Sequence, residues 1–91
     1  MARATLLARH QVEDYAAWRS VYDSVEGLRR AHGCTDAEVL VDPADTEDVY
    51  VLHRFPTLGQ AQAYAGSNEL REAMGRAGVA GAPRIEIAVE A

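Results

Sequence analysis

The chain has 91 residues, of which 48% are hydrophobic, and this is enough for a single domain over residues 1–91 with a real core. Its net charge of −5 argues against a nucleic-acid or anionic-membrane surface. One cysteine, Cys34, cannot form an internal disulfide, so we expect a reduced, cytoplasmic setting. The N-terminus is too charged for a signal peptide, and no run approaches the roughly 18 apolar residues of a membrane span.

The first predicted elements are a strand and a helix. Residues 5–10 alternate between two faces, as a strand requires, with Leu6 and His10 on the same face. An apolar stripe at three- and four-residue spacing then predicts one helix that ends at Gly33, with Gly27 weakening it without breaking it. The stripe comprises Tyr15, Trp18, Val21, Tyr22, Val25, Leu28 and Arg29. Arg29 and Arg30 suit the negative pole at the end of this helix.

The middle of the chain predicts two further strands. Ala37–Val41 is the second strand, and the polar stretch Asp42–Asp48 connects it to the third. The third strand, Val49–Phe55, is apolar on both parities, so we expect it to be buried on both faces. Pro56 ends the strand because it has no N–H to donate.

A broken second helix and a last strand complete the chain. Thr57 and Gln60 fit a capping box at the start of the helix, and Ser67 is a second start signal within it. Gly78 ends the helix. Residues 79–83 then read as a loop, and alternation over residues 84–90 predicts the fourth strand.

The order β-α-β-β-α-β predicts a ferredoxin-like α+β fold, a four-stranded antiparallel sheet with both helices on one face. In this plan the first and third strands are central and run parallel, and the second and fourth are the edges. The face left bare by the helices carries apolar residues of both central strands, so we expect a homodimer in which two such sheets pack face to face. The alternative is a monomer with a half-polar open face.

Four stretches together resemble the antibiotic biosynthesis monooxygenase-like family of dimeric α/β-barrel proteins. They are Leu6–His10, Val12–Arg19, Val51–Phe55 and Ala63–Met74. The resemblance covers nearly the whole chain and implies a dimeric barrel with a pocket between sheet and helices in each subunit. Members include quinone-forming monooxygenases that oxidise aromatic polyketides with O₂ and no cofactor, polyketide cyclases, haem-degrading enzymes, muconolactone isomerases and proteins of unknown role.

Two departures from the family pattern narrow the chemistry. Haem-degrading members carry a haem-ligating histidine on the second helix, whereas residues 58–77 contain none, so we do not expect haem. Position 55 is Phe where many members have tryptophan, so no indole N–H is available there.

His10 and His53 are the candidate catalytic bases. Each lies at an end of a central strand, and parallel central strands would bring both imidazoles to the same end of the sheet. A histidine in a cleft can accept or deliver a proton near neutral pH. The alternative is that they are hydrogen-bonded strand-end residues. We expect no metal, because no third ligand lies at suitable spacing.

The aromatic residues of the helices are candidates for a substrate pocket. Trp18, Tyr22 and Tyr64 point inward and could stack on a flat ligand or donate phenol hydrogen bonds, with ordinary core packing as the alternative. Tyr22 and Tyr64 are therefore candidate catalytic partners of the histidines. Met74 is a further candidate for lining the pocket.

Arg54 and Arg71 are the candidate anion stabilisers, with a surface ion pair as the alternative.

Three functions stay open. The first is a cofactor-independent monooxygenase acting on an aromatic or polyketide-like metabolite; the second is a cyclase or isomerase that uses the same pocket without O₂. The third is a non-catalytic dimeric ligand-binding or accessory protein.

Overall fold

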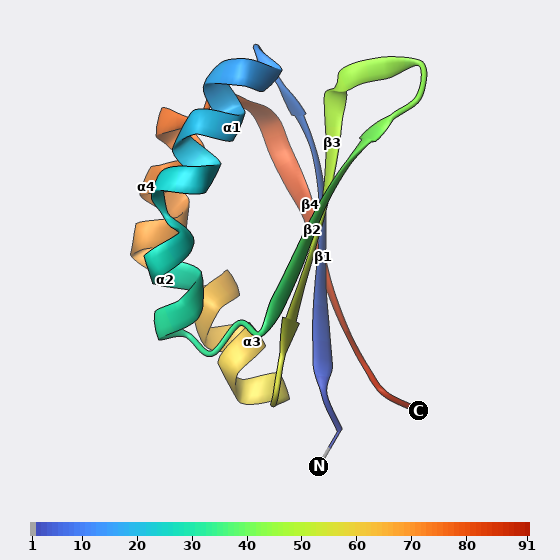
Figure 1. The fold of residues 1–91 in the computed structure, drawn as a ribbon, viewed down its shortest axis with the longest axis vertical. Coiled ribbons are helices and arrows are strands. Elements are labelled where there is room, and N and C mark those ends of the chain that lie inside the picture. The colour runs from blue at the N-terminus through green and yellow to red at the C-terminus, as the bar shows by residue number, and fades with distance from the viewer. Residues whose placement is uncertain (1) are drawn as a thin grey trace.

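The computed structural model describes residues 2–91, which form four strands and four short helices (Figure 1). Met1 of the predicted domain lies outside the described residues. The elements, in chain order, are β1 Ala4–Val12, α1 Tyr15–Ser24, α2 Glu26–Ala31, β2 Asp36–Asp42, β3 Asp45–Phe55, α3 Leu58–Ala65, α4 Asn68–Arg76 and β4 Val79–Val89. The ferredoxin-like plan is confirmed, with each of its two helices divided into two.

All four strands form one sheet in the order β2-β3-β1-β4, and every neighbouring pair is antiparallel. The expectation that the first and third strands run parallel is wrong. Each helical crossover returns the chain in its original direction, so β2 runs parallel to β1, and the hairpin then reverses β3. Leu6 consequently faces His53, whereas His10 faces Val49.

The helices cover one face of the sheet and leave the other bare (Figure 1). Along β3 the residues that face the helices are buried, namely Val49, Val51, His53 and Phe55. The alternate residues of β3 on the bare face, from Tyr50 to Arg54, are half-buried. In the single chain, β3 is therefore buried on the face toward the helices and only half-buried on the other, whereas burial on both faces was expected.

The first helix is divided at Val25, contrary to the expectation of one continuous helix. Val25 has φ −105° and ψ 18°, outside the helical values. The Ser24 hydroxyl donates to the Val21 carbonyl oxygen at 2.6 Å, a local bond that bends helices. The division lies two residues before Gly27, so glycine is not its site. Gly33, at φ 92°, follows α2 as predicted.

The predicted caps of the second helical region are confirmed. The hydroxyl oxygens of Thr57 and Ser67 accept hydrogen bonds from the backbone N–H groups of Gln60 and Leu70, each at 3.2 Å. Thr57 opens α3 and Ser67 opens α4. Because each cap satisfies an otherwise free N–H, the two short helices start at fixed points beside the sheet.

All four strands are longer than the sequence predicts, and β3 and β4 gain the most. The expected polar link over residues 42–48 shrinks to a turn at Pro43 and Ala44, because Asp45 and the residues after it already pair in β3. The expected loop over residues 79–83 belongs to β4. Residues 81–83 form a bulge there, since Arg9 pairs with Arg84 while Gln11 pairs with Ala80, so three residues lie opposite His10.

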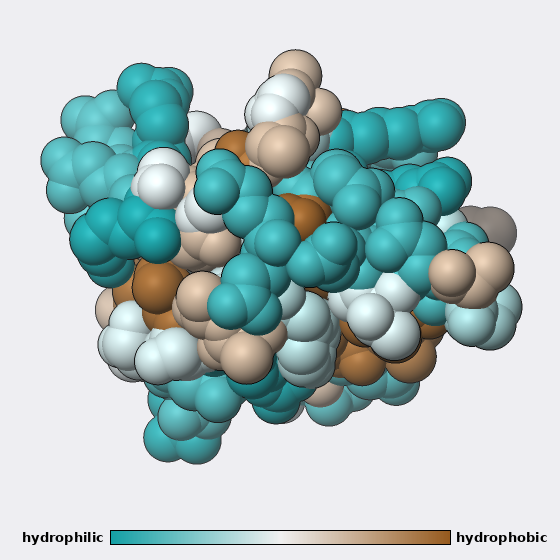
Figure 2. Space-filling view, turned by 90° about the horizontal axis from the view of Figure 1, so that it is seen from above, coloured by the Kyte–Doolittle hydropathy of each residue, from teal (hydrophilic) through white to brown (hydrophobic). Residues whose placement is uncertain are grey.

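The end of the molecule seen in Figure 2 is mostly hydrophilic, and apolar residues appear only in small patches. Among the helices of residues 2–91, none combines the length and apolar character needed to cross a membrane.

Gly27 inside α2 and Gly33 just after it give a matched test of this region. Gly27→Ala should raise the free energy of unfolding by about 0.5–1 kcal/mol, because the new methyl group meets nothing within 4 Å and glycine is a poor helix former. Gly33→Ala should lower it by about 1–2 kcal/mol, because φ is 92° there and the Cβ would lie 2.5 Å from the Gln60 side-chain nitrogen. Urea denaturation measures both, and equal effects would contradict the assigned end of α2.

Candidate functional site

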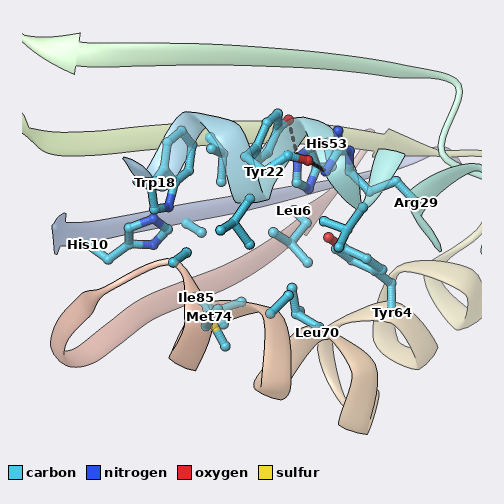
Figure 3. A pocket seen from close by; sticks show the side chains of 16 residues that line it. Leu6, His10, Trp18, Tyr22, Arg29, His53, Tyr64, Leu70, Met74 and Ile85 are labelled. Carbon is cyan, nitrogen blue, oxygen red and sulfur yellow. Dashed lines mark hydrogen bonds between the residues drawn. The ribbon is translucent and has the colours of Figure 1, made fainter. Parts of the chain in front are cut away.

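A pocket lies between the sheet and the helices, lined by side chains from β1, β3, β4 and from all four helices (Figure 3). Its walls are mostly apolar. The floor on the sheet is formed by Leu6, Ala8, Val51 and Ile85. On the helix side, Trp18 and Val21 of α1 face Leu70 and Met74 of α4. The polar groups are few and gather at its two ends.

The antiparallel pairing separates the two histidines along the pocket. His53 is opposite Leu6, so His10 lies four residues further along β1, or about 13 Å. The expectation that both imidazoles lie at the same end of the sheet is therefore wrong, although both lie on its covered face. Figure 3 shows His10 beside Trp18 at one end, with His53 beside Tyr22 and Arg29 at the other.

His53 is buried in the site, with 3% of its surface exposed. Its Nε2 lies 2.8 Å from the Tyr22 hydroxyl, and its ring packs against Tyr22 and Tyr64. Its Nδ1 is buried and has no hydrogen-bond partner within residues 2–91. Burial, and secondarily the positive charge of Arg29, lower the pKa of His53 from 6.5 to about 4. The imidazole is thus neutral at pH 7, with an unused ring nitrogen.

His10 occupies the other end and is also unpartnered. Its ring is 7% exposed and lies 5.6 Å from the Trp18 ring, and neither ring nitrogen has a hydrogen-bond partner in the described part of the chain. Burial lowers the pKa of His10, while the Asp48 carboxylate opposes this shift. The β4 bulge lies directly beside His10. Such irregularities redirect side chains and are frequent next to functional sites.

Arg29, in the last turn of α2, is a functional candidate that the sequence placed on the apolar stripe and at the helix pole, with no role in the pocket. Arg29 is buried, with 5% of its surface exposed. Its guanidinium lies 3.8 Å from the centre of the Tyr22 ring, and Nη1 donates to the Tyr22 carbonyl oxygen at 2.9 Å. The signal for it was present, because Arg29 stands on the apolar stripe of the first helical region. A cation at a core position calls for a partner.

Tyr22 and Tyr64 supply phenol groups beside His53. Burial raises the pKa of Tyr22, and it raises that of Tyr64 to about 12, with the Arg29 charge opposing both shifts. Both hydroxyls are therefore neutral at pH 7 and able to donate hydrogen bonds. Together with His53 and Arg29 they make one polar end in an otherwise apolar pocket.

Two predicted pocket residues lie elsewhere. Arg54 is on the bare face of the sheet, where it pairs with Asp36 at 2.7 Å and with Glu38 at 3.6 Å. Arg71 is on α4, outside the pocket lining, and bonds Asn68 in an exposed position. The alternation of β3 explains the first displacement, because adjacent residues point to opposite faces. Trp18 and Met74 do line the pocket.

The pocket is narrow in this conformation. Its volume is about 50 Å³. A cavity of about 150 Å³ holds benzene, so this one has space for water and not for an aromatic ring unless a wall moves. The wall formed by α4 consists of the small Ala73 and Ala77 and the flexible Leu70 and Met74. Such side chains can rearrange at modest cost. Within residues 2–91, no cluster of three His, Cys, Asp or Glu side chains is placed to hold a metal ion.

Comparison with known proteins finds similarity at the level of the fold. No family model matches the sequence, and no curated protein does. Among solved structures, a candidate antibiotic biosynthesis monooxygenase from Bordetella bronchiseptica superposes with a TM-score of 0.82 at 13% identity, over 100% of this chain and 99% of that one. A second, from Caulobacter crescentus, gives 0.77 at 18% identity, over 96% and 88%.

SnoaB of Streptomyces nogalater, a cofactor-independent oxygenase, superposes with a TM-score of 0.75 at 10% identity, over 100% of this chain and 93% of that one. The chain therefore has the fold of the antibiotic biosynthesis monooxygenase-like proteins, and the resemblance seen in the sequence is confirmed at the level of the fold. At these identities the likeness does not extend to the reaction.

The low pKa of His53 has a measurable consequence for stability. Because the folded-state pKa of about 4 lies below the ordinary 6.5, the unfolded chain binds the proton first. The free energy of unfolding should be highest above pH 6.5 and fall between pH 6.5 and pH 4, by on the order of 3 kcal/mol from this group. NMR titration of the ring measures the pKa directly. In His53→Gln this part of the pH dependence should vanish, and a His53 ring that titrates near 6.5 would contradict its burial.

Proposed function

We propose that this protein is a small cofactor-independent monooxygenase-like enzyme that acts on an aromatic or polyketide-like metabolite in the pocket between sheet and helices. The observation that carries the proposal is the buried polar end of that pocket, where the unpartnered Nδ1 of His53 lies among Tyr22, Tyr64 and Arg29. The shared fold with a cofactor-independent oxygenase supports it.

The chemistry needs a base, an anion stabiliser and a dry site. Removal of a proton from a carbon flanked by phenol rings gives a carbanion that can donate an electron to O₂ directly. In the net reaction the CH₂ carbon takes one oxygen atom of O₂ to become a carbonyl, and the other oxygen leaves as water with both hydrogens. The protein contributes the proton transfer, the exclusion of bulk water and the stabilisation of negative charge.

Each role falls to a residue of the pocket. His53 is the base, because it is neutral at pH 7 and shares its end of the pocket with the cation that would stabilise the carbanion. Tyr22 and Tyr64 donate hydrogen bonds to the developing oxyanion, and Trp18 is the stacking wall. His10 binds a polar group at the far end. No metal or organic cofactor takes part.

The pocket volume of about 50 Å³ favours a second candidate, a non-catalytic dimeric accessory protein in which these aromatic residues are core. A cyclase or isomerase would use the same groups without O₂. Oxygen consumption separates this reaction from the first, because an isomerase leaves the O₂ concentration unchanged while its substrate is converted.

The open face of the sheet supports a homodimer, which we propose to be cytoplasmic. Leu7 pairs across the strands with Leu52, and Leu40 pairs with Tyr50, which gives an apolar centre on that face. Leu7 is 39% exposed and Leu40 is 51% exposed in the single chain. The ion pair of Arg9 with Asp48 flanks this centre. Pairing of two such faces would bury the apolar centre and leave the charges at the rim.

Oxygen uptake tests the reaction. With hydroxylated anthrones and naphthols as a panel, the wild-type protein should consume O₂ as the quinone absorbance rises. His53→Gln should lower the rate by about 10²–10³-fold, since it removes the base. Arg71→Gln, a change outside the pocket, should leave the rate unaltered. Turnover without O₂ loss would indicate the isomerase, and the absence of turnover across the panel would favour the accessory protein.

Sedimentation tests the dimer. The wild-type protein should sediment at about twice its 9.9 kDa chain mass at micromolar concentration. Leu7→Glu should return it to a single chain, because a charge would be buried at the centre of the interface. Leu58→Glu is the matched control, since Leu58 is 42% exposed but belongs to α3. A wild-type particle of 9.9 kDa would contradict the proposed dimer. Equal sedimentation of the Leu7→Glu and Leu58→Glu variants would contradict the proposed interface.

A further inference from the structure

Arg29 is a buried cation whose charge is not balanced by a neighbouring carboxylate. Among residues 2–91, no carboxylate oxygen lies within 4 Å of its guanidinium. The two acidic residues nearest along the chain are engaged by other arginines, Asp23 by Arg19 at 3.1 Å and Glu26 by Arg30 at 3.2 Å. Burial of an unpaired ion is costly, and a guanidinium keeps its charge inside proteins.

The pocket is the place from which a counterion would reach Arg29. In the described part of the chain, no Asp or Glu lines the pocket, so the Arg29 guanidinium is the one formally charged group of the pocket at pH 7. The protein as a whole has a net charge of −5. Arg29 also borders two surface grooves beside β2. Apart from Arg29, each groove has two carboxylates and one arginine: Asp23, Glu26 and Arg19 in one, and Glu26, Asp36 and Arg30 in the other. Both grooves are therefore less favourable to an anion than the pocket, which has no carboxylate among its described lining residues. The charge distribution therefore favours an anion on the pocket side.

The donors of this end are largely unused. A guanidinium has five N–H groups. In Arg29, Nη1 donates to the Tyr22 carbonyl oxygen at 2.9 Å, and hydrogen bonding from the guanidinium to the Tyr64 hydroxyl opposes the rise in the pKa of Tyr64, so other N–H groups remain for a ligand. The Tyr22 and Tyr64 hydroxyls are neutral and adjoin the same space. The next stretch of the pocket is apolar, formed by Leu6, Leu70 and Met74 (Figure 3). A ligand that matches these surroundings has an oxyanion at one end and a flat apolar body.

We infer that the pocket binds its ligand as an anion, a conjugated carboxylate or an ionised phenol, with the oxyanion on the Arg29 guanidinium and the ring over Leu6. The inference rests on the proposed function, which it deepens by naming the charge state and the anchoring end of the substrate. It makes Arg29 a substrate-binding residue, in the role that the sequence suggested for Arg54 or Arg71. The ring displaces Leu70 and Met74 on entry, because the space present holds only water.

Two probes of matched shape and different charge test the anchor at pH 7. Benzoate and benzamide have nearly the same shape, and only benzoate is charged. Calorimetry should give at least tenfold tighter binding of benzoate to the wild-type protein, and the fluorescence of Trp18, the one tryptophan, should report the same binding from inside the pocket. 4-Nitrophenol, titrated below and above its own pKa, shows whether a phenolate is accepted as well as a carboxylate.

Variants locate the anion. Arg29→Met should abolish the preference for benzoate, whereas Arg30→Met should keep it, since Arg30 is exposed on the same helix and pairs with Glu26. Circular dichroism verifies that each variant is folded. If Arg29→Met does not fold, the wild-type comparison of benzoate with benzamide still decides the matter.

A second readout follows from the position of His53. The positive charge of Arg29 is one cause of the low pKa of His53, and an anion on Arg29 would offset that charge. Benzoate should therefore raise the pKa of His53 from about 4 toward 6.5, as measured by NMR titration. Tyr22 and Tyr64 are the other titratable groups that contact the His53 ring. The inference is overturned if benzoate and benzamide bind within twofold of each other, if millimolar benzoate does not bind, or if Arg29→Met keeps the preference. Oxygen uptake with the anthrone panel is independent of these outcomes, so the reaction and the anchor can fail separately.

Discussion

The two-residue alternation of β3 determines which side chains share the interior. Val49, Val51, His53 and Phe55 face the helices, and Arg54 faces the open side, where it pairs with Asp36. A register slip of one residue would exchange the neutral imidazole for a guanidinium and expose the apolar set. The pocket, the enclosed His53 and the open face all depend on this register, which the pairings of β3 with β1 and β2 hold on both sides.

The electrostatics of the site follow from burial more than from pairing. The pKa values of His53 and Tyr64 move in the directions that keep both groups neutral, and in each case desolvation is the largest cause. Arg29 is the exception, because a guanidinium cannot escape its charge by losing a proton. An acidic protein thus holds an isolated positive charge inside, and this contrast gives the pocket its polarity.

Local signals in the sequence predicted much of this architecture. The caps at Thr57 and Ser67, the end of the first helical region at Gly33 and the alternation of the strands are properties of short segments, and the structure has them as expected. The direction of β3 relative to β1 and the position of Arg54 depend on how distant segments pair. Periodicity alone does not encode that pairing. Arg29 differs from these, because a basic residue in the last turn of a helix is expected from the helix dipole whether it is exposed or buried, so its position there does not by itself indicate a buried cation.

The bulge of residues 81–83 separates β4 into two independently anchored halves. Residues 84–89 pair with the start of β1, and Val79 and Ala80 pair with its end, so the segment opposite His10 is not held in the ladder. Changes in length or composition there would alter the edge of the sheet beside His10 without disturbing the pairing of the two central strands. A length change at this point of β4 therefore leaves Arg29 and His53, which lie on other elements, in place.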